Sequence, residues 1–374
     1  MDLRTKFLGL ELKNPVIMSA GPLTGNGEGM VKAVERGAAA VITKTIVNEI
    51  RPNVRPRVMK NECGLYNIEL YSDFSLEHWE KEIAYAKSHG VIVIGNILGH
   101  SASELTYTAR KVESYGVDAI EISLFSPHGE GIDGIVDRPE RLYELTKSVV
   151  DNVKIPVMVK LSANVSNVGN LAKEAKKAGA AALSGIDTVR AIPGVNLRTG
   201  KALLPTYGGY SGDGIRPISL AAVASMAQAT NLPVSGVGGI SKGSHVLEFI
   251  MLGANTIQLC SSVILNGYEH VSVILREMEE IMKELNIHSL EKIRGVALES
   301  LSSFEEIANE PLVARIMNNH RCDECTGLCK KACLYEAIDI KDGEYRVIEK
   351  QCTGCGLCPS VCPFDQIDMV YSSL

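Results

Sequence analysis

Eight of the ten cysteines of this chain lie between Cys322 and Cys362, in two runs of four. The first run has the spacing C-x2-C-x3-C-x3-C, and the second has the spacing C-x2-C-x2-C-x3-C followed by Pro363. Cys thiolates at the second spacing typically hold a [4Fe–4S] cluster. The two runs therefore predict a module that binds two clusters and transfers single electrons.

In two-cluster modules of this kind, the fourth Cys of each run binds the other cluster. We therefore expect one cluster on Cys322, Cys325, Cys329 and Cys362. The other is expected on Cys352, Cys355, Cys358 and Cys333. The first run has one extra residue between its second and third Cys, and Leu334 stands where the second run has Pro363. A modified or labile cluster in the first run is therefore one alternative. Structural zinc, whose ligands usually form two pairs, and disulfides, which need an oxidising compartment, are the others.

Length and composition limit the classes of protein to consider. The 374 residues fit one barrel plus a small module, and 45% hydrophobic and 22% charged residues are ordinary for a soluble protein. A net charge of −6 argues against nucleic-acid binding. We find no signal peptide and no apolar run long enough to span a membrane. With its clustered cysteines, the chain is expected in a reducing cytoplasm. Cys63 and Cys260, outside the runs, are expected to be buried small hydrophobic residues.

Eight short, almost continuously apolar segments precede the cysteine runs, and helix-forming segments separate them. This pattern is typical of parallel strands covered on both faces. Eight such units in succession favour a TIM (β/α)8 barrel over a doubly wound sheet. The strands are expected at Pro15–Ala20, Ala39–Thr43, Val91–Gly95, Ala119–Ser123, Pro156–Lys160, Ala181–Ile186, Pro233–Gly236 and Thr256–Cys260.

The other segments complete the expected organisation. A small hairpin, Thr5–Leu8 with Glu11–Lys13, should close the barrel floor, and helices should follow the last strand at Val271–Leu285 and Leu290–Val296. We expect an α/β barrel over residues 1–300, a helical connector over 301–319 and a small ferredoxin-like two-cluster domain over 320–374.

The residues that follow the strands could bind a flavin. In a TIM barrel, functional residues lie just past the carboxyl ends of the strands. Lys44 and Lys160 lie at two of these ends, and Gly238 and Gly239 follow the seventh strand. Exposed backbone N–H groups there favour a phosphate. A Lys is rarely buried without a partner, and a flavin ring edge or phosphate would supply one. The alternative is that both lysines extend to solvent.

Several stretches resemble the dihydroorotate dehydrogenase superfamily, and in particular its dihydropyrimidine dehydrogenases, which combine an FMN barrel with a C-terminal two-cluster domain. The similar stretches are Ser19–Pro22, Ile42–Thr45, Asn67–Leu70, Ser126–Gly129, Val159–Leu161, Tyr207–Gly212, Ile215–Pro217, Gly238–Ile240 and Gln258–Ser261. The resemblance implies that the barrel binds FMN and performs redox chemistry at a C=C bond beside a carbonyl.

The resemblance also implies roles for individual residues. Ser126 occupies the position of the catalytic acid/base, and Lys44 would stabilise negative charge on the reduced ring. Substrate would contact Asn67, Ser123, Asp187 and Thr188. The expected FMN contacts are Ala20, Gly21, Lys44, Thr45, Asn96, Lys160, Ser211, Gly212, Gly238, Gly239, Cys260 and Ser261.

Three positions depart from the family pattern. Ser123 and Asp187 replace asparagines, and Ser126 replaces the Cys of the dihydropyrimidine dehydrogenases. Because an ionised Asp only accepts hydrogen bonds, Asp187 disfavours a substrate carboxylate unless Arg190 neutralises it. Ser126 is a weaker acid than Cys and needs a proton relay; alternatively it caps a turn. We expect His128 to be structural.

Three functions remain open. The first is a dihydropyrimidine dehydrogenase-like oxidoreductase. The second is a related ene-reductase or dehydrogenase for a non-pyrimidine substrate, and the third is an electron-transfer subunit without substrate turnover. No G-x-G-x-x-G motif follows a strand near the N-terminus. We therefore expect electrons from a separate FAD/NAD(P)H-binding subunit or a ferredoxin. We also expect a homo-oligomer.

Overall fold

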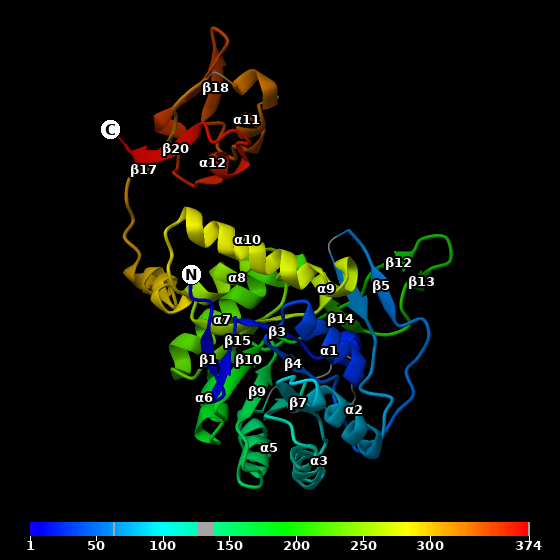
Figure 1. Cartoon of the computed structure of the whole chain (residues 1–374). Helices are drawn as coiled ribbons and strands as arrows, with labels where there is room; N and C mark the ends of the chain where they lie inside the picture. Colours follow the sequence, from blue (N-terminus) through cyan, green and yellow to red (C-terminus); the bar gives the residue numbers. More distant parts are fainter. Residues whose placement is uncertain (63, 126–137, 320, 326, 373–374) are drawn as a thin grey trace. The chain divides into compact units, whose positions relative to one another are not determined.

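The computed structural model describes residues 1–374 except 63, 126–137, 320, 326 and 373–374. The described chain divides into two compact units, Met1–Leu301 and Ser302–Leu374 (Figure 1). None of the described helices is both long enough and apolar enough to cross a membrane.

Eight parallel strands form a closed barrel in the first unit, in the order β10-β15-β16-β3-β4-β7-β8-β9. Each strand overlaps one of the eight predicted segments, which confirms the TIM barrel. The strands are β3 Val16–Met18, β4 Ala40–Ile42, β7 Val93–Ile97, β8 Ala119–Ser123, β9 Val157–Leu161, β10 Ala182–Gly185, β15 Val234–Val237 and β16 Ala254–Leu259.

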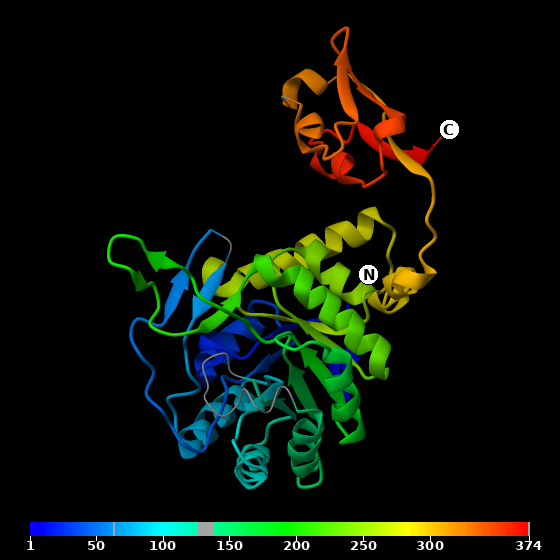
Figure 2. The ribbon, with the colours of Figure 1, turned by 180° about the vertical axis from the view of Figure 1, so that it is seen from behind.

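Helices surround the barrel, as Figure 2 shows from behind. Their sequences explain this placement. In α2, for example, Leu76, Trp79 and Ile83 recur at helical spacing and are buried, and the side chain of Ser75 accepts a hydrogen bond from the His78 amide to cap the helix start. The helices are α1 Gly27–Glu35, α2 Leu76–Ser88, α3 Ala102–Ser114, α5 Pro139–Val150, α6 Val168–Lys177, α7 Arg216–Thr230, α8 Gly243–Met251, α9 Ser261–Asn266 and α10 His270–Glu284.

The inside of the barrel changes from apolar to polar along its axis. At the amino ends of the strands, the predicted hairpin of β1 (Thr5–Phe7) and β2 (Leu10–Leu12) packs against inward-facing apolar residues such as Ile17 and Met158. Further along, the buried inward positions are polar. They include Ser19, Asn96, Glu121, Ser184 and Gln258. An apolar core thus fills the barrel at the amino ends of its strands. Hydrogen-bonding groups lie inside the barrel nearer the carboxyl ends of the strands.

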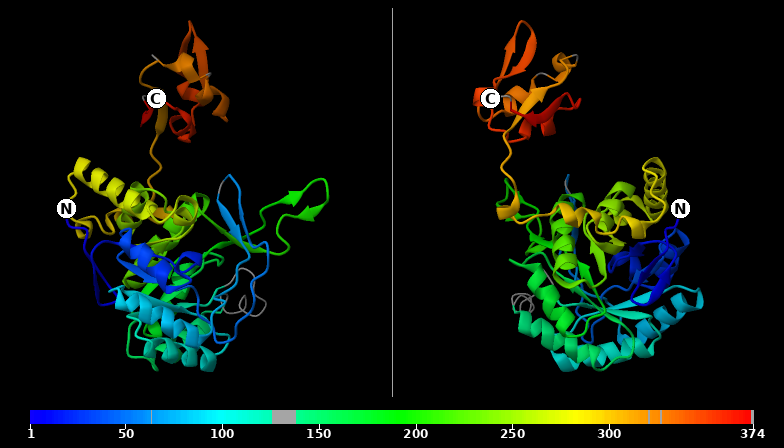
Figure 3. Two further views of the ribbon diagram at one scale, coloured as in Figure 1. Left: turned by 45° about the vertical axis from the view of Figure 1, so that its right-hand side comes forward. Right: turned by 90° about the vertical axis from the view of Figure 1, so that its left-hand side faces the viewer.

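Sequence reasoning missed a small antiparallel sheet over the barrel mouth. It has the order β11-β14-β6-β5, and β6 brings Asn67 into register with both Gly209 and Val58. A further hairpin, β12 with β13, extends from it (Figure 3). The bounds are β5 Val58–Lys60, β6 Leu65–Asn67, β11 Val189–Ala191, β12 Val195–Asn196, β13 Lys201–Ala202 and β14 Gly208–Ser211.

In the second unit, two antiparallel strand pairs and two short helices enclose the cysteines. β17 (Leu312–Ile316) pairs with β20 (Ile367–Tyr371), and β18 (Ile338–Lys341) pairs with β19 (Glu344–Val347). The helices are α11 Leu328–Ala332 and α12 Leu357–Val361.

Two expected helical segments differ from the structure. Residues 301–319, expected as a helical connector, contain only the 3-10 turn Phe304–Glu306 and then the strand β17. All five residues of Leu312–Ile316 pair in antiparallel register with β20, and this pairing keeps the segment extended. The segment after α10 forms the 3-10 turns Leu290–Lys292 and Val296–Ser300 in place of a helix.

Candidate active site

A cavity opens at the carboxyl ends of the barrel strands, where the sequence predicts the functional residues. Most of the predicted FMN and substrate positions line it. They are Ala20, Gly21, Lys44, Thr45, Asn67, Ser123, Lys160, Asp187, Thr188, Ser211, Gly212, Gly238, Gly239, Cys260 and Ser261. Asn96 is fully buried inside the barrel and does not line this cavity. Ser126 and His128 lie outside the described residues.

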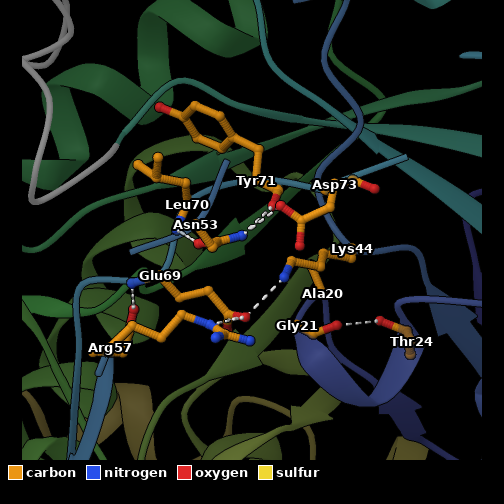
Figure 4. Close-up of polar contacts among 12 residues, drawn as sticks. Ala20, Gly21, Thr24, Lys44, Asn53, Arg57, Glu69, Leu70, Tyr71 and Asp73 are labelled. Atoms are coloured by element: carbon orange, nitrogen blue, oxygen red, sulfur yellow. Dashed lines mark hydrogen bonds and ion pairs between the residues drawn. The ribbon is translucent and has the colours of Figure 1, made fainter. Parts of the chain in front are cut away.

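On one wall, Lys44 belongs to a group of three charged side chains. The Glu69 carboxylate accepts hydrogen bonds from Lys44 Nζ at 2.8 Å and from Arg57 Nε at 3.2 Å (Figure 4). Only 12% of the Lys44 side chain and 9% of the Glu69 side chain are exposed. The pair therefore fixes the Lys44 ammonium at the wall, and two of its three N–H donors have no partner within the described ranges and could serve a ligand. Sequence reasoning missed Glu69 as a partner, although it lies in the similar stretch Asn67–Leu70.

Lys160 lies almost buried in the cavity floor, on β9. Burial alone would lower the pKa of this ammonium, but the carboxylates of Glu121 and Asp187 raise the pKa above its ordinary value. Lys160 is thus a cation at neutral pH, as a group that stabilises negative charge on a bound ring must be.

The wall predicted to contact substrate contains one carboxylate, that of Asp187. Asp187 Oδ1 accepts from the Thr188 amide at 2.6 Å, and the Ser123 hydroxyl donates to Asp187 Oδ2 across 3.4 Å. The Asn67 side chain is held by two backbone groups: Oδ1 accepts from the Glu69 amide at 3.2 Å, and Nδ2 donates to the Gly209 carbonyl at 3.5 Å. Asp187 therefore offers a cavity ligand a carboxylate acceptor at a position where the resemblance implies an amide.

Another wall is built from glycines and serines after β15 and β16. Gly238 and Gly239 have φ of +119° and +75°, and a Cβ on Gly239 would lie 2.6 Å from the Arg216 Cβ. The turn therefore requires glycine, and its backbone can closely approach a ligand. The Ser262 hydroxyl is buried and has no hydrogen-bond partner among the described residues.

Cys260 lines one corner of the cavity, where it is partly exposed. Burial raises the pKa of its thiol to about 11, against the opposing effect of Lys160. It remains a neutral thiol at physiological pH and therefore packs without acting as a nucleophile. A Cβ on Gly21 would lie 2.8 Å from the Cys260 sulfur, so the two residues fit together only because residue 21 is glycine.

The cysteines of the C-terminal unit line two separate cavities. One is lined by Cys322, Cys325, Cys329 and Cys362. The other is lined by Cys333, Cys352, Cys355 and Cys358. In each cavity, three cysteines of one run therefore meet the fourth cysteine of the other run, which is the arrangement that the spacing predicts.

Backbone amides also point at these sulfurs. The amides of Ala337 and Gln366 donate to Cys333 and Cys362, at 3.2 and 3.4 Å, and each amide lies four residues after its cysteine. Hydrogen bonds of this kind to the sulfurs help to set the reduction potential of an iron–sulfur cluster. Among the described residues, no three His, Cys, Asp or Glu side chains converge as ligands of a single metal ion would.

Comparison with known families agrees with both the barrel and the cysteine-rich unit. A family model described as dihydroorotate dehydrogenase matches residues 2–282. The chain belongs to this family. A second model, the LdpA Fe-S cluster-binding domain, matches residues 322–372. As a member of the dihydroorotate dehydrogenase family, the protein is a flavin-dependent oxidoreductase that acts on CH–CH bonds, and it carries an iron–sulfur-binding domain.

Individual relatives cover most of the chain. The catalytic subunit of dihydroorotate dehydrogenase B (NAD(+)) from Thermoplasma volcanium is 35% identical over 79% of this chain and 99% of its own length. The corresponding subunit from Methanocaldococcus jannaschii is 32% identical over 79% of this chain and 98% of its own length. The chloroplastic dihydropyrimidine dehydrogenase (NADP(+)) from Arabidopsis thaliana is 30% identical over 82% of this chain and 79% of its own length.

Proposed function

We propose that this family member uses FMN and two [4Fe–4S] clusters to reduce or oxidise a C=C bond next to a carbonyl, in the manner of a dihydropyrimidine dehydrogenase. The main support is one cavity at the barrel mouth that holds Lys44 and Lys160 opposite a glycine and serine wall. The same chain also contains two cavities that are each lined by four cysteines.

The cavity residues fit FMN. The N–H groups around Gly238 and Gly239 suit a phosphate ester, as does the Ser262 hydroxyl, which has no partner in the described part of the chain. The small residues Ala20 and Gly21 leave room for a flat ring. Bound FMN would supply the two-electron chemistry at the C=C bond. Lys44 and Lys160 would place fixed positive charge where the reduced ring carries negative charge. Ser126, in the family's acid/base position, would donate or accept the substrate proton.

The substrate wall favours a neutral ring with an N–H group. Asp187 and Ser123 replace the family's amides, and Asp187 can only accept a hydrogen bond while it is ionised. A substrate carboxylate beside it would be repelled, whereas a ring N–H would be bound. This chemistry disfavours dihydroorotate and favours a cyclic amide that turns an N–H group toward Asp187. A related non-pyrimidine substrate is the alternative, because Asp187 lacks the amide donor of the pyrimidine pattern.

The cysteine-lined cavities support single-electron transfer to an outside partner. Iron–sulfur clusters exchange one electron at a time, so a partner with one-electron chemistry completes the reaction. The Thermoplasma and Methanocaldococcus relatives are each named as a catalytic subunit, which supports a separate FAD/NAD(P)H-binding subunit here. A ferredoxin is the alternative donor.

Anaerobic purification followed by a turnover screen tests this proposal. We expect one FMN and about eight irons per chain, as two [4Fe–4S] clusters require, and turnover of uracil or thymine with reduced viologen. Turnover restricted to other enones would favour the related ene-reductase. Bound FMN and clusters with no turnover on any substrate would favour an electron-transfer subunit. FAD in place of FMN, or zinc in place of iron, would refute the proposal.

A further inference from the structure

A carboxylate with no access to solvent lies beneath the cavity. Glu121, on β8, is 0% exposed and accepts three hydrogen bonds inside the barrel. Its donors are Asn96 Nδ2 at 2.5 Å, Ser184 Oγ at 2.6 Å and Gln258 Nε2 at 3.3 Å. They come from β7, β10 and β16, so one side chain connects four strands of the barrel. All three partners donate, so the Glu121 carboxylate is the common acceptor of this group.

The strand register places this carboxylate beside Lys160. β9 lies between β8 and β10. Lys160 of β9 is in register with Ser184 of β10 and with Ser123 of β8, two residues beyond Glu121. Side chains two residues apart on a strand point to the same face, so Glu121 and Lys160 both point into the barrel. The Glu121 carboxylate accepts a hydrogen bond from Ser184 of β10, on the far side of β9. The carboxylate therefore lies over the inner face of β9, at the level of Lys160.

The same carboxylate determines the orientation of Asn96. Its Nδ2 group donates to Glu121, and its buried Oδ1 has no partner among the described residues. A buried acceptor without a partner is costly, and it remains available to an N–H donor.

A buried carboxylate is tolerated when charge and hydrogen bonds compensate it. Here three donors and the neighbouring Lys160 do so. The compensation is mutual, because Glu121 also cancels part of the positive field that Lys160 presents to the cavity above. That field favours a ligand more strongly as the ligand gains negative charge.

We propose that Glu121 is a positioning residue that orients Lys160 and Asn96 beneath the FMN ring and, by partly neutralising Lys160, limits how much more tightly reduced FMN is bound than oxidised FMN. This inference depends on the proposed binding of FMN. Glu121 itself does not line the cavity, so it acts through its neighbours.

The substitution Glu121→Gln removes the charge and keeps the shape. We expect the ratio of the dissociation constants of oxidised and reduced FMN to rise at least tenfold, which is a midpoint potential about 30 mV more positive for a two-electron couple. Spectroelectrochemical titration of the bound flavin measures this shift directly, without turnover. The matched control is Glu269→Gln, a mostly exposed carboxylate that pairs with Arg36; its ratio should not change.

The possible results separate the inference from the proposed function. FMN bound by Glu121→Gln with an unchanged ratio would overturn the role of Glu121 and leave the proposed function intact. Wild-type protein that binds no FMN would overturn both. If Glu121→Gln does not fold, Glu121→Asp keeps the charge but cannot reach Ser184 and draws the carboxylate away from Lys160. It should raise the ratio at least twofold, and an unchanged ratio would again overturn the inference.

Discussion

The substitution Asp187→Asn should widen the substrate range toward pyrimidine rings. In the structure, one carboxylate oxygen accepts the Thr188 amide at 2.6 Å, and the other lies 3.4 Å from the Ser123 hydroxyl. An Asn carbonyl can keep the shorter bond, and the Asn NH2 group then replaces the oxygen that has only the longer one. The fold should therefore tolerate the change, while the cavity gains a donor and loses a negative charge.

The expected change in kcat/KM follows from the free-energy cost of leaving a substrate carbonyl without a hydrogen-bond donor. A ring carbonyl placed against the carboxylate has no donor, and leaving a buried acceptor unpaired costs about 1–3 kcal/mol. Supplying the donor should raise kcat/KM for uracil or thymine by roughly 5- to 150-fold. Orotate should gain as well, because its carboxylate no longer meets that of Asp187. A substrate that donates an N–H to Asp187 should lose activity by a similar factor.

Anaerobic steady-state kinetics with reduced viologen would measure these changes. Each variant is assayed with uracil, thymine and orotate, and Glu269→Gln serves as the control for a lost surface carboxylate. If kcat/KM of Asp187→Asn matches the wild-type value for every ring substrate, Asp187 does not contact substrate and the argument for a neutral substrate fails.

Three further predictions concern electron flow and proton transfer. NADH or NADPH alone should not bleach the flavin at a catalytic rate, since no dinucleotide motif is visible; rapid bleaching in stopped-flow absorbance would reveal a missed site. Cys352→Ala should remove one cluster, as iron analysis would show. FMN should remain bound because the barrel is a separate compact unit. Steady turnover with a one-electron donor should then fall, and unaffected turnover would place the clusters off the path. Ser126→Ala should abolish turnover with FMN retained, whereas Ser126→Cys should stay active with a pH profile shifted toward the lower pKa of a thiol. Equal activity of Ser126→Ala and wild type would remove Ser126 from the mechanism.

The barrel was predictable because its strands are buried on both faces. Segments such as Val157–Leu161 are almost continuously apolar, and the exception, Lys160, is a residue that we predicted to contact FMN. The cysteine grouping was predictable for a different reason: short covalent spacings leave few ways to surround a cluster. Both features depend on local sequence, so they can be predicted without knowledge of the tertiary contacts.

The residues that sequence reasoning missed depend on contacts between distant segments. Glu69 contacts Lys44 only because the small sheet over the barrel mouth carries it there, and short strands such as Leu65–Asn67 have no distinctive pattern. Glu121 stands in an apolar run, where its partners on three other strands are invisible until the barrel closes. The strand β17 was missed because its pairing with β20 is what makes it extended.

The charges around the cavity explain why the residue at position 187 should influence the electrostatic environment of the ring as well as substrate binding. Each lysine has carboxylate neighbours: Lys44 pairs with Glu69, and Lys160 is influenced by Glu121 from within the barrel and by Asp187 from the cavity wall. An Asn at position 187, as in the family pattern, would leave Lys160 with only the carboxylate inside the barrel. The Asp in this chain therefore reduces the positive field above Lys160 at the same time as it selects an N–H donor. Substrate choice and the electrostatic environment of the ring are thus coupled through one lysine, and Asp187→Asn should alter both.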